Sequence, residues 1–358
     1  MLIGSEESIK LEPSRMRHFA DILNPLFVNE KCKVFETLFQ FVCTLVRAAG
    51  MKDTGWDSYT ESTEFMRDLG NLRTLDYPDE KFPDPLNTHA RLALISYCHI
   101  TEMNFPYDLI ANLLRLHLGL KYHTNPLGSL AEPIYRKVNG VRKIVDFRQP
   151  SPSKKMKKIQ EMSDGANMPE VGKALQEIYN STVRNAVYHS DYVVHNGSMR
   201  LLSNTWYSEE EGCMTPLIPF ASLATITNEA FAFHSALLAL YNRDRRSLRD
   251  FIGKFCPYDH VYKGLMEFIF EGDLVIGFRV YWPNEMVSEY SRYSDSRCVA
   301  NNLSFNHDGS IDFCVGTYAS TPSVFSPLVE MGEEPVYAIA NELGGRPYWP
   351  AEPKAYAL

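Results

Sequence analysis

Apolar residues at helical spacing are the feature that most limits how this chain can fold. A helix that packs on a core carries apolar side chains every three or four residues, and several long segments keep that spacing. The clearest is segment 169–189, where Pro169 suits the first turn and an apolar stripe continues to about His189. These segments predict a mainly α protein with a central helical bundle. The other expected helices cover residues 36–49, 86–103, 107–118 and 220–241.

Short extended runs around turn sequences predict a smaller amount of β structure. Two runs flank Asn196-Gly197, a pair that suits the two-residue turn of a β-hairpin, so we expect a hairpin directly after the 169–189 helix. Beyond residue 250 the same reasoning predicts a smaller α+β region with two hairpins. Their expected strands are residues 266–270 with 274–281, and 298–305 with 311–318.

The remaining segments divide the chain into expected domains. Residues 122–148 contain several prolines and glycines and predict a loop with at most a short strand, and the Pro- and Ser-rich start of 149–158 predicts a hinge. A short helix is expected near 330–343, followed by an irregular tail. We therefore expect an N-terminal helical extension over 1–85, a helical domain over 86–250 and an α+β region over 251–358.

Composition narrows the class of protein. The 358 residues are 45% apolar, which allows a large core, and neither a membrane span nor a signal peptide is apparent, so we expect a cytoplasmic protein. Seven cysteines without a CxxC pair indicate neither a disulfide framework nor a zinc site. No P-loop, dinucleotide fingerprint, HExxH or GxSxG pattern is present. We expect no metal and no cofactor. The net charge of −8 means that any contact with nucleic acid is local.

Side chains that could take part in catalysis lie close together in sequence at the end of the 169–189 helix. Arg184 and His189 have the spacing RxxxxH, with Asn185 after the arginine and Ser190 and Asp191 after the histidine. On a continuous helix Arg184 and His189 would lie about 140° apart, so they converge most easily if the helix stops near His189. Histidine can move protons near neutral pH, and arginine offers a fork of donors to phosphate. The pair therefore suits proton transfer next to a phosphate.

This motif resembles the RxxxxH motif of the HEPN family, whose members include ribonucleases of toxin and antiviral systems. The resemblance covers residues 86–241 in architecture and 184–192 in residues. It implies a HEPN-like helical bundle and a homodimer whose cleft holds Arg184, Asn185 and His189 from both chains, with RNA as substrate. It also implies cyclic-phosphate products and an antitoxin or regulatory protein as a further partner. Asn185 would orient the histidine or a phosphate, or Asp191, supported by Ser190, would do so.

Two other interpretations stay open at this point. The motif can belong to a non-catalytic HEPN-like binding or sensor protein, or Arg184 and His189 can simply hydrogen-bond the last carbonyls of a helix in an unrelated protein. A nearby lysine run offers contacts to RNA phosphates, although charge runs are usually solvated faces. The lysines of this run are Lys154, Lys155, Lys157 and Lys158.

Overall fold

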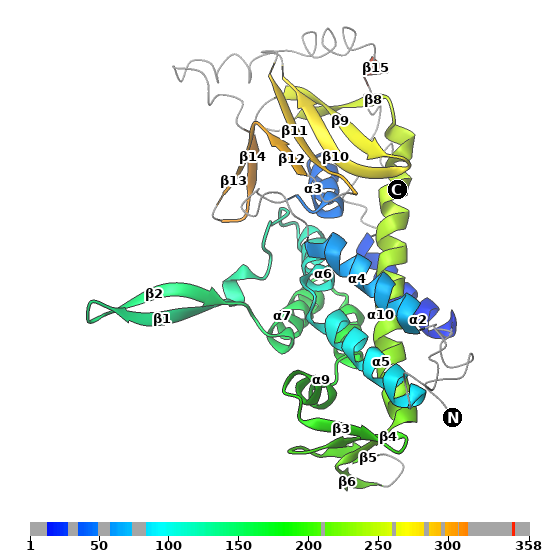
Figure 1. The fold of residues 1–358 in the computed structure, drawn as a ribbon. Coiled ribbons are helices and arrows are strands. Elements are labelled where there is room, and N and C mark those ends of the chain that lie inside the picture. Colours follow the sequence, from blue (N-terminus) through cyan, green and yellow to red (C-terminus); the bar gives the residue numbers. More distant parts are fainter. Residues whose placement is uncertain are drawn as a thin grey trace. The chain divides into compact units, whose positions relative to one another are not determined.

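The computed structural model describes residues 13–27, 35–48, 58–73, 84–208, 212–259, 263–282, 286–294, 298–306, 308–313 and 346–347. They group into two compact units (Figure 1). Unit 1 comprises Met1–Leu23, Ser58–Pro106 and Ser151–Leu238, and unit 2 comprises Asn24–Asp57, Tyr107–Pro150 and Ala239–Leu358. Each unit therefore draws on three separate stretches of sequence.

Unit 1 has a helical core. Phe19 and Phe233 are fully buried and meet edge to face, with ring centroids 5.5 Å apart. Leu94 and Leu175, from other helices of this unit, are also fully buried. The helices that contribute are α2 (Pro13–Phe27) as far as Leu23, α4 (Ser58–Arg73), α5 (Pro85–Glu102), α7 (Pro152–Gly165), α8 (Pro169–Glu177), α9 (Ser181–Tyr188) and α10 (Phe220–Ser247) as far as Leu238.

Unit 1 also contains a three-stranded antiparallel sheet that follows α9. Its strands are β3 (Tyr192–His195), β4 (Ser198–Leu201) and β7 (Leu217–Pro219), in the order β3-β4-β7. Asn196 and Gly197 form the turn with φ values of 49° and 73°, so the predicted hairpin is confirmed. A second hairpin pairs β5 (Trp206–Ser208) with β6 (Cys213–Thr215).

Unit 2 is built around a six-stranded sheet in the order β12-β11-β10-β9-β8-β15. The buried ring of Phe39, on α3 (Phe35–Val46), packs against Phe278 of the sheet with centroids 5.0 Å apart. Helix α6 (Asn104–His117) contributes residues from Tyr107 onward. The strands are β8 (Lys254–Asp259), β9 (Lys263–Glu271), β10 (Leu274–Tyr281), β11 (Val287–Arg292), β12 (Cys298–Asn301) and β15 (Arg346–Pro347).

The two hairpins predicted after residue 250 have different outcomes. β9 and β10 pair antiparallel around Gly272, so the first prediction is confirmed. The second hairpin differs from the expectation within the described residues: β13 (Leu303–Phe305) pairs with β14 (Ile311–Phe313), while residues 298–301 join the large sheet as β12. Residues 314–318 of the expected strand lie outside the described residues. The helix expected at 330–343 lies outside the described residues.

The prediction of a mainly α protein is wrong. The described residues form five sheets in addition to the helices, and the six-stranded sheet organises unit 2, so the fold is α+β. Residues 122–148, expected to be mostly loop, contain a long hairpin of β1 (Glu132–Val138) and β2 (Val141–Arg148). Its turn, Asn139-Gly140, has φ values of 52° and 79°, the same chemistry as the Asn196-Gly197 turn.

Two helical segments also differ from the expectation. The 169–189 helix is two helices, α8 and α9, because the Asn180 side chain accepts a hydrogen bond from the amide of Val183 and caps a new helix. The expected hinge over 149–158 is instead the start of α7, which opens on Pro152 as a favoured first-turn residue. Proline and lysine there begin a helix and do not mark a linker.

One helix among those described is long and apolar enough to cross a membrane. It is α10 with its continuation to Phe251, and half of its most apolar window is buried within the protein itself. Fully buried residues such as Phe233 and Leu237 form part of this helix.

Candidate functional site

Helix α9 ends where the RxxxxH motif required it to end. Tyr188 is its last residue, and His189 is the C-cap with φ −91° and ψ 0°. The amide of Ser190 donates to Val187 and the amide of Asp191 donates to Ala186, which together form a Schellman motif. The predicted helix stop near His189 is therefore confirmed, and this closure fixes the direction in which the chain leaves the helix.

Arg184 lies one turn before this end and is held by its own chain. Its Nε donates to Glu102 Oε1 at 2.6 Å, and Nη2 forms an ion pair with the same carboxylate. Nη1 donates to Asn185 Oδ1 at 2.9 Å, and the guanidinium lies 4.4 Å from the ring centroid of Tyr188. A guanidinium has five N–H groups, so one on Nη1 and one on Nη2 have no partner among the described residues. These two can reach an external oxyanion.

His189 is exposed, and its ring forms no hydrogen bond to any residue that the structure describes. Its backbone amide donates to Asn185, whose side-chain oxygen is occupied by Arg184. Asn185 thus orients the arginine in this structure, whereas the sequence had suggested that it orients the histidine or a phosphate. The imidazole stays open to a ligand.

Side chains of helix α5 hydrogen-bond to the motif helix and to the residue that precedes it. The Tyr97 hydroxyl donates to the carbonyl of Asn180 at 3.3 Å and accepts from the amide of Asn180 at 2.6 Å, which fixes the junction between α8 and α9. Five residues later on α5, the Glu102 carboxylate accepts the hydrogen bond from Arg184 Nε. Cys98 lies between them, and burial raises the pKa of its thiol to about 12, so this cysteine is not a nucleophile near neutral pH.

Ser190 occupies a backbone position that favours glycine. Its φ is +54°, and an exposed serine in this left-handed region carries strain from its Cβ. We expect Ser190→Gly to raise the free energy of unfolding by about 0.5–1 kcal/mol, measured by urea denaturation. Ser190→Ala keeps the Cβ and should bring no gain. A loss of stability in Ser190→Gly would mean that the hydroxyl holds the helix end.

The residues after the motif border a pocket. Asp191 Oδ1 accepts a hydrogen bond from Ser203 Oγ at 2.9 Å, and the Asp191 carbonyl accepts from the amide of Leu202. Ser203 and Leu202 both line a pocket of about 840 Å³ in the sheet region of unit 1. The end of α9 and this pocket are therefore joined by direct hydrogen bonds.

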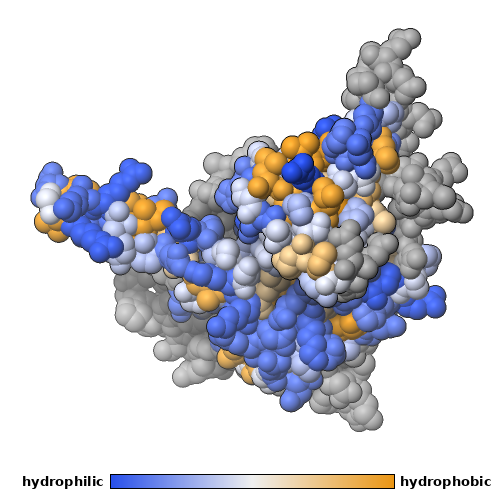
Figure 2. Space-filling view, turned by 90° about the horizontal axis from the view of Figure 1, so that it is seen from below, coloured by the Kyte–Doolittle hydropathy of each residue, from blue (hydrophilic) through white to orange (hydrophobic). Residues whose placement is uncertain are grey.

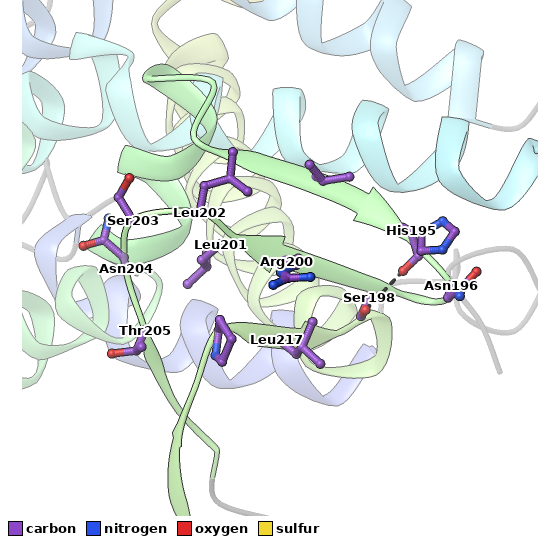
Figure 3. Close-up of a pocket in the computed structure, with 12 residues that line it drawn as sticks. His195, Asn196, Ser198, Arg200, Leu201, Leu202, Ser203, Asn204, Thr205 and Leu217 are labelled. Carbon is purple, nitrogen blue, oxygen red and sulfur yellow. Dashed lines mark hydrogen bonds between the residues drawn. The ribbon is translucent and has the colours of Figure 1, made fainter.

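The pocket lies over the exposed face of the β3-β4-β7 sheet (Figure 3). Val193, Arg200 and Leu217 stand opposite one another in register and all three are exposed. The neighbouring row contains His195 and Ser198, with Ser198 Oγ donating to the His195 carbonyl at 3.1 Å. The pocket thus offers one guanidinium and one imidazole beside apolar side chains, a mixture that suits a phosphate next to a base or a ring.

The lysine run proposed for RNA contact is only partly available. Lys155 is 5% exposed, and its ammonium donates to Asn104 Oδ1 at 2.6 Å, so it is an internal contact between α7 and the start of α6. Lys158 forms an ion pair with Glu161 one turn away. Lys154 and Lys157 are exposed on the outer face of α7. The lysine run is therefore part of one helix, α7, in which Lys155 is buried and the other lysines lie toward solvent.

Two findings limit what else the site can be. Within the described ranges, no group of three or more His, Cys, Asp and Glu side chains is arranged to hold a metal ion. Comparison of the chain with family models, with curated proteins and with solved structures gives no match. The function is therefore inferred from the site itself.

Sequence reasoning missed the residues of the pocket. Arg200 and His195 lie in the segment already expected to form a hairpin, and strict alternation along its strands places them on one face. That alternation was the signal that could have found them. Glu102, which holds Arg184 from a separation of 82 residues, has no comparable signal in the sequence.

Proposed function

We propose that this protein is a HEPN-like, metal-independent endoribonuclease that acts as a homodimer in the cytoplasm, in a toxin or antiviral defence system. The observation that carries the proposal is the end of α9. There an exposed His189 follows a guanidinium that Glu102 and Asn185 hold in place with two donors unused. A fixed guanidinium and a solvent-exposed imidazole at the end of the same helix suit the cleavage of a phosphodiester.

The reaction needs one group to accept a proton and another to donate one. His189 of one copy takes the proton of the ribose 2′-hydroxyl, and the 2′-oxygen attacks the adjacent phosphorus. The bond from phosphorus to the 5′-oxygen breaks, and the 5′-oxygen takes a proton from the protonated His189 of a second copy. Arg184 stabilises the charge on the phosphoryl oxygens. The products are a 2′,3′-cyclic phosphate and a 5′-hydroxyl, with no other reactant consumed.

Arg200 would bind a phosphate of the RNA strand next to the motif. It is an exposed cation, and within the part of the chain that the structure describes it has no carboxylate partner. A phosphate beside Arg200 would place the neighbouring part of the strand along the pocket, whose Ser203 contacts Asp191 at the end of the motif. The exposed Val193 and Leu217 would contact the sugar or base.

A second candidate is a non-catalytic HEPN-like binding module, with an antitoxin or regulatory protein as partner. One observation favours it. Glu102 receives both Nε and Nη2 of Arg184 within the same chain, so the charge of the guanidinium is already balanced. On this proposal the ion pair stabilises the junction of α5 and α9, and the pocket beside them receives the ligand.

The test uses the full chain with cellular RNA in the presence of EDTA. We expect wild-type cleavage that leaves cyclic-phosphate ends, and a fall of about 100-fold or more in His189→Ala, since a general acid–base group contributes that much. His18→Ala is the matched control, because His18 is another exposed histidine of unit 1 that lies near Glu177. Its cleavage rate should not change.

Melting curves accompany the assay. The His189 ring has no hydrogen bond within the described structure, so His189→Ala should melt like the wild type. Equal cleavage in wild type and His189→Ala would sink the catalytic proposal. RNA that is retained but not cut by either protein would move the conclusion to the binding module.

A further inference from the structure

The β1–β2 hairpin, residues 132–148, is exposed to solvent along both strands and is called the basic arm below. Every residue of its two strands except Ile134 is exposed. Figure 1 shows it as a projecting two-stranded ribbon, and the projecting part of the surface in Figure 2 carries hydrophilic and hydrophobic residues side by side. An isolated two-stranded hairpin is only marginally stable in water. Its large exposed apolar side chains are Tyr135, Val138, Val141, Ile144, Val145 and Phe147.

The charge of the basic arm is opposite to that of the chain. Five cations and two carboxylates give it a net charge of +3, while the whole protein carries −8. Four of the cations lie in the half nearest the turn, and within the described residues none of these four has a carboxylate at ion-pair distance. They are Arg136, Lys137, Arg142 and Lys143.

The register of the hairpin places like charges opposite each other. Arg136 pairs with Lys143, and Lys137 pairs with Arg142, in two successive cross-strand positions. Like charges directly opposite destabilise a hairpin. Arg142 also lies over the Tyr135 ring, 4.1 Å from its centroid. The two like-charge pairs therefore do not stabilise the hairpin. The ligand that such pairs fit is a polyanion.

The two basic pairs lie on opposite faces of the ribbon. Successive side chains of a strand alternate between faces, so Arg136 and Lys143 share one face while Lys137 and Arg142 share the other. A flat acidic protein surface would satisfy only one of these pairs. A groove between two rows of phosphates would satisfy both, and the major groove of B-form DNA, about 12 Å wide, admits a two-stranded ribbon.

We propose that the basic arm binds B-form duplex DNA by entering its major groove, with one basic pair facing each row of phosphates. The apolar pair at the tip, Val138 and Val141, then reaches the floor of the groove, where thymine methyl groups provide apolar contact. The major groove of an A-form RNA duplex is deep and narrow, so it excludes the ribbon. This inference goes beyond the proposed RNA cleavage and does not depend on it.

The test measures DNA affinity of the full chain against salt concentration, using fluorescence anisotropy with a short labelled duplex. DNA has no 2′-hydroxyl, so binding is read without cleavage, and failure of the ribonuclease proposal leaves this measurement intact. Two double variants remove one face each: Arg136→Gln with Lys143→Gln, and Lys137→Gln with Arg142→Gln. The matched control is Arg67→Gln with Lys173→Gln, since both residues are exposed on helices of unit 1.

Each arm variant removes two phosphate contacts, so the slope of log affinity against log salt should fall by about 1.8 in both. The control, which loses the same charge, should keep the wild-type slope. An effect in only one of the two arm variants would overturn the groove geometry. Three results would overturn the proposal as a whole: equal slopes in arm and control variants, arm variants that weaken binding to single-stranded DNA more than binding to the duplex, or a change of oligomeric state in the arm variants.

Discussion

Replacing Gly277 by alanine should destabilise unit 2 by about 3 kcal/mol or more. Gly277 is buried on β10 and pairs with Ser291 of β11. A Cβ built at this position would lie 2.0 Å from the carbonyl oxygen of Tyr290 and 2.6 Å from the Cα of Ser291. Both atoms belong to the backbone of the paired strand, so neither can move aside without breaking the ladder. Urea denaturation measures the loss.

Gly70→Ala is the matched control. Gly70 lies within α4, and a Cβ there would meet nothing within 4 Å. Alanine favours a helix over glycine by about 1 kcal/mol, so this variant should be more stable than the wild type. The same substitution is thus expected to act in opposite directions at the two positions. A Gly277→Ala protein as stable as Gly70→Ala would show that β10 and β11 do not pair as described.

Acidification should destabilise unit 1 through His234. This histidine of α10 is buried, and burial, with a smaller effect from His99, lowers its pKa from 6.5 to about 4. Between these two values the unfolded chain binds the proton and the folded chain does not. The free energy of unfolding therefore falls as pH falls from about 6.5 to about 4, by at most about 1.4 kcal/mol per pH unit and about 3 kcal/mol in all.

The prediction is measured as a difference between two proteins. His234→Leu keeps a buried side chain without a titrating group, so its stability should decline less steeply over that range, while carboxylates affect both proteins equally. Urea denaturation at several pH values provides the comparison. Burial also lowers the pKa of His99, so some dependence of the same sign should remain in the variant. Parallel curves for the two proteins would contradict the assignment to His234.

Sequence reasoning found elements whose signal is local. Helical spacing placed α3, α5, α6 and α10 within a few residues of their bounds, apart from the C-terminal extension of α10 to Ser247, and the Asn-Gly pair at 196–197 identified a hairpin. At 139–140 the same pair stands among prolines and glycines that favour a loop, so its hairpin is not predicted. Together with the large sheet of unit 2, that omission made the expected fold too helical. The order of strands in the sheet depends on pairings between distant segments.

The candidate site was predictable only in part for a related reason. Arg184 and His189 are close in sequence, and the helix end between them was expected. The carboxylate that holds Arg184 comes from α5, and the burial of Lys155 depends on Asn104, so both contacts need the folded chain to be seen. A charge run such as 154–158 does not reveal which of its members points inward.

The interleaving of the two units along the chain has a consequence for how the protein is made. Unit 1 has all of its segments once Leu238 has been synthesised, whereas unit 2 also requires the strands that follow Ala239. The apolar helix α3 of unit 2 therefore leaves the ribosome long before the sheet that packs against Phe39 has been synthesised. During that interval a chaperone would find exposed hydrophobic surface. No single cut of the polypeptide separates the units, so truncated fragments are poor substitutes for the full chain.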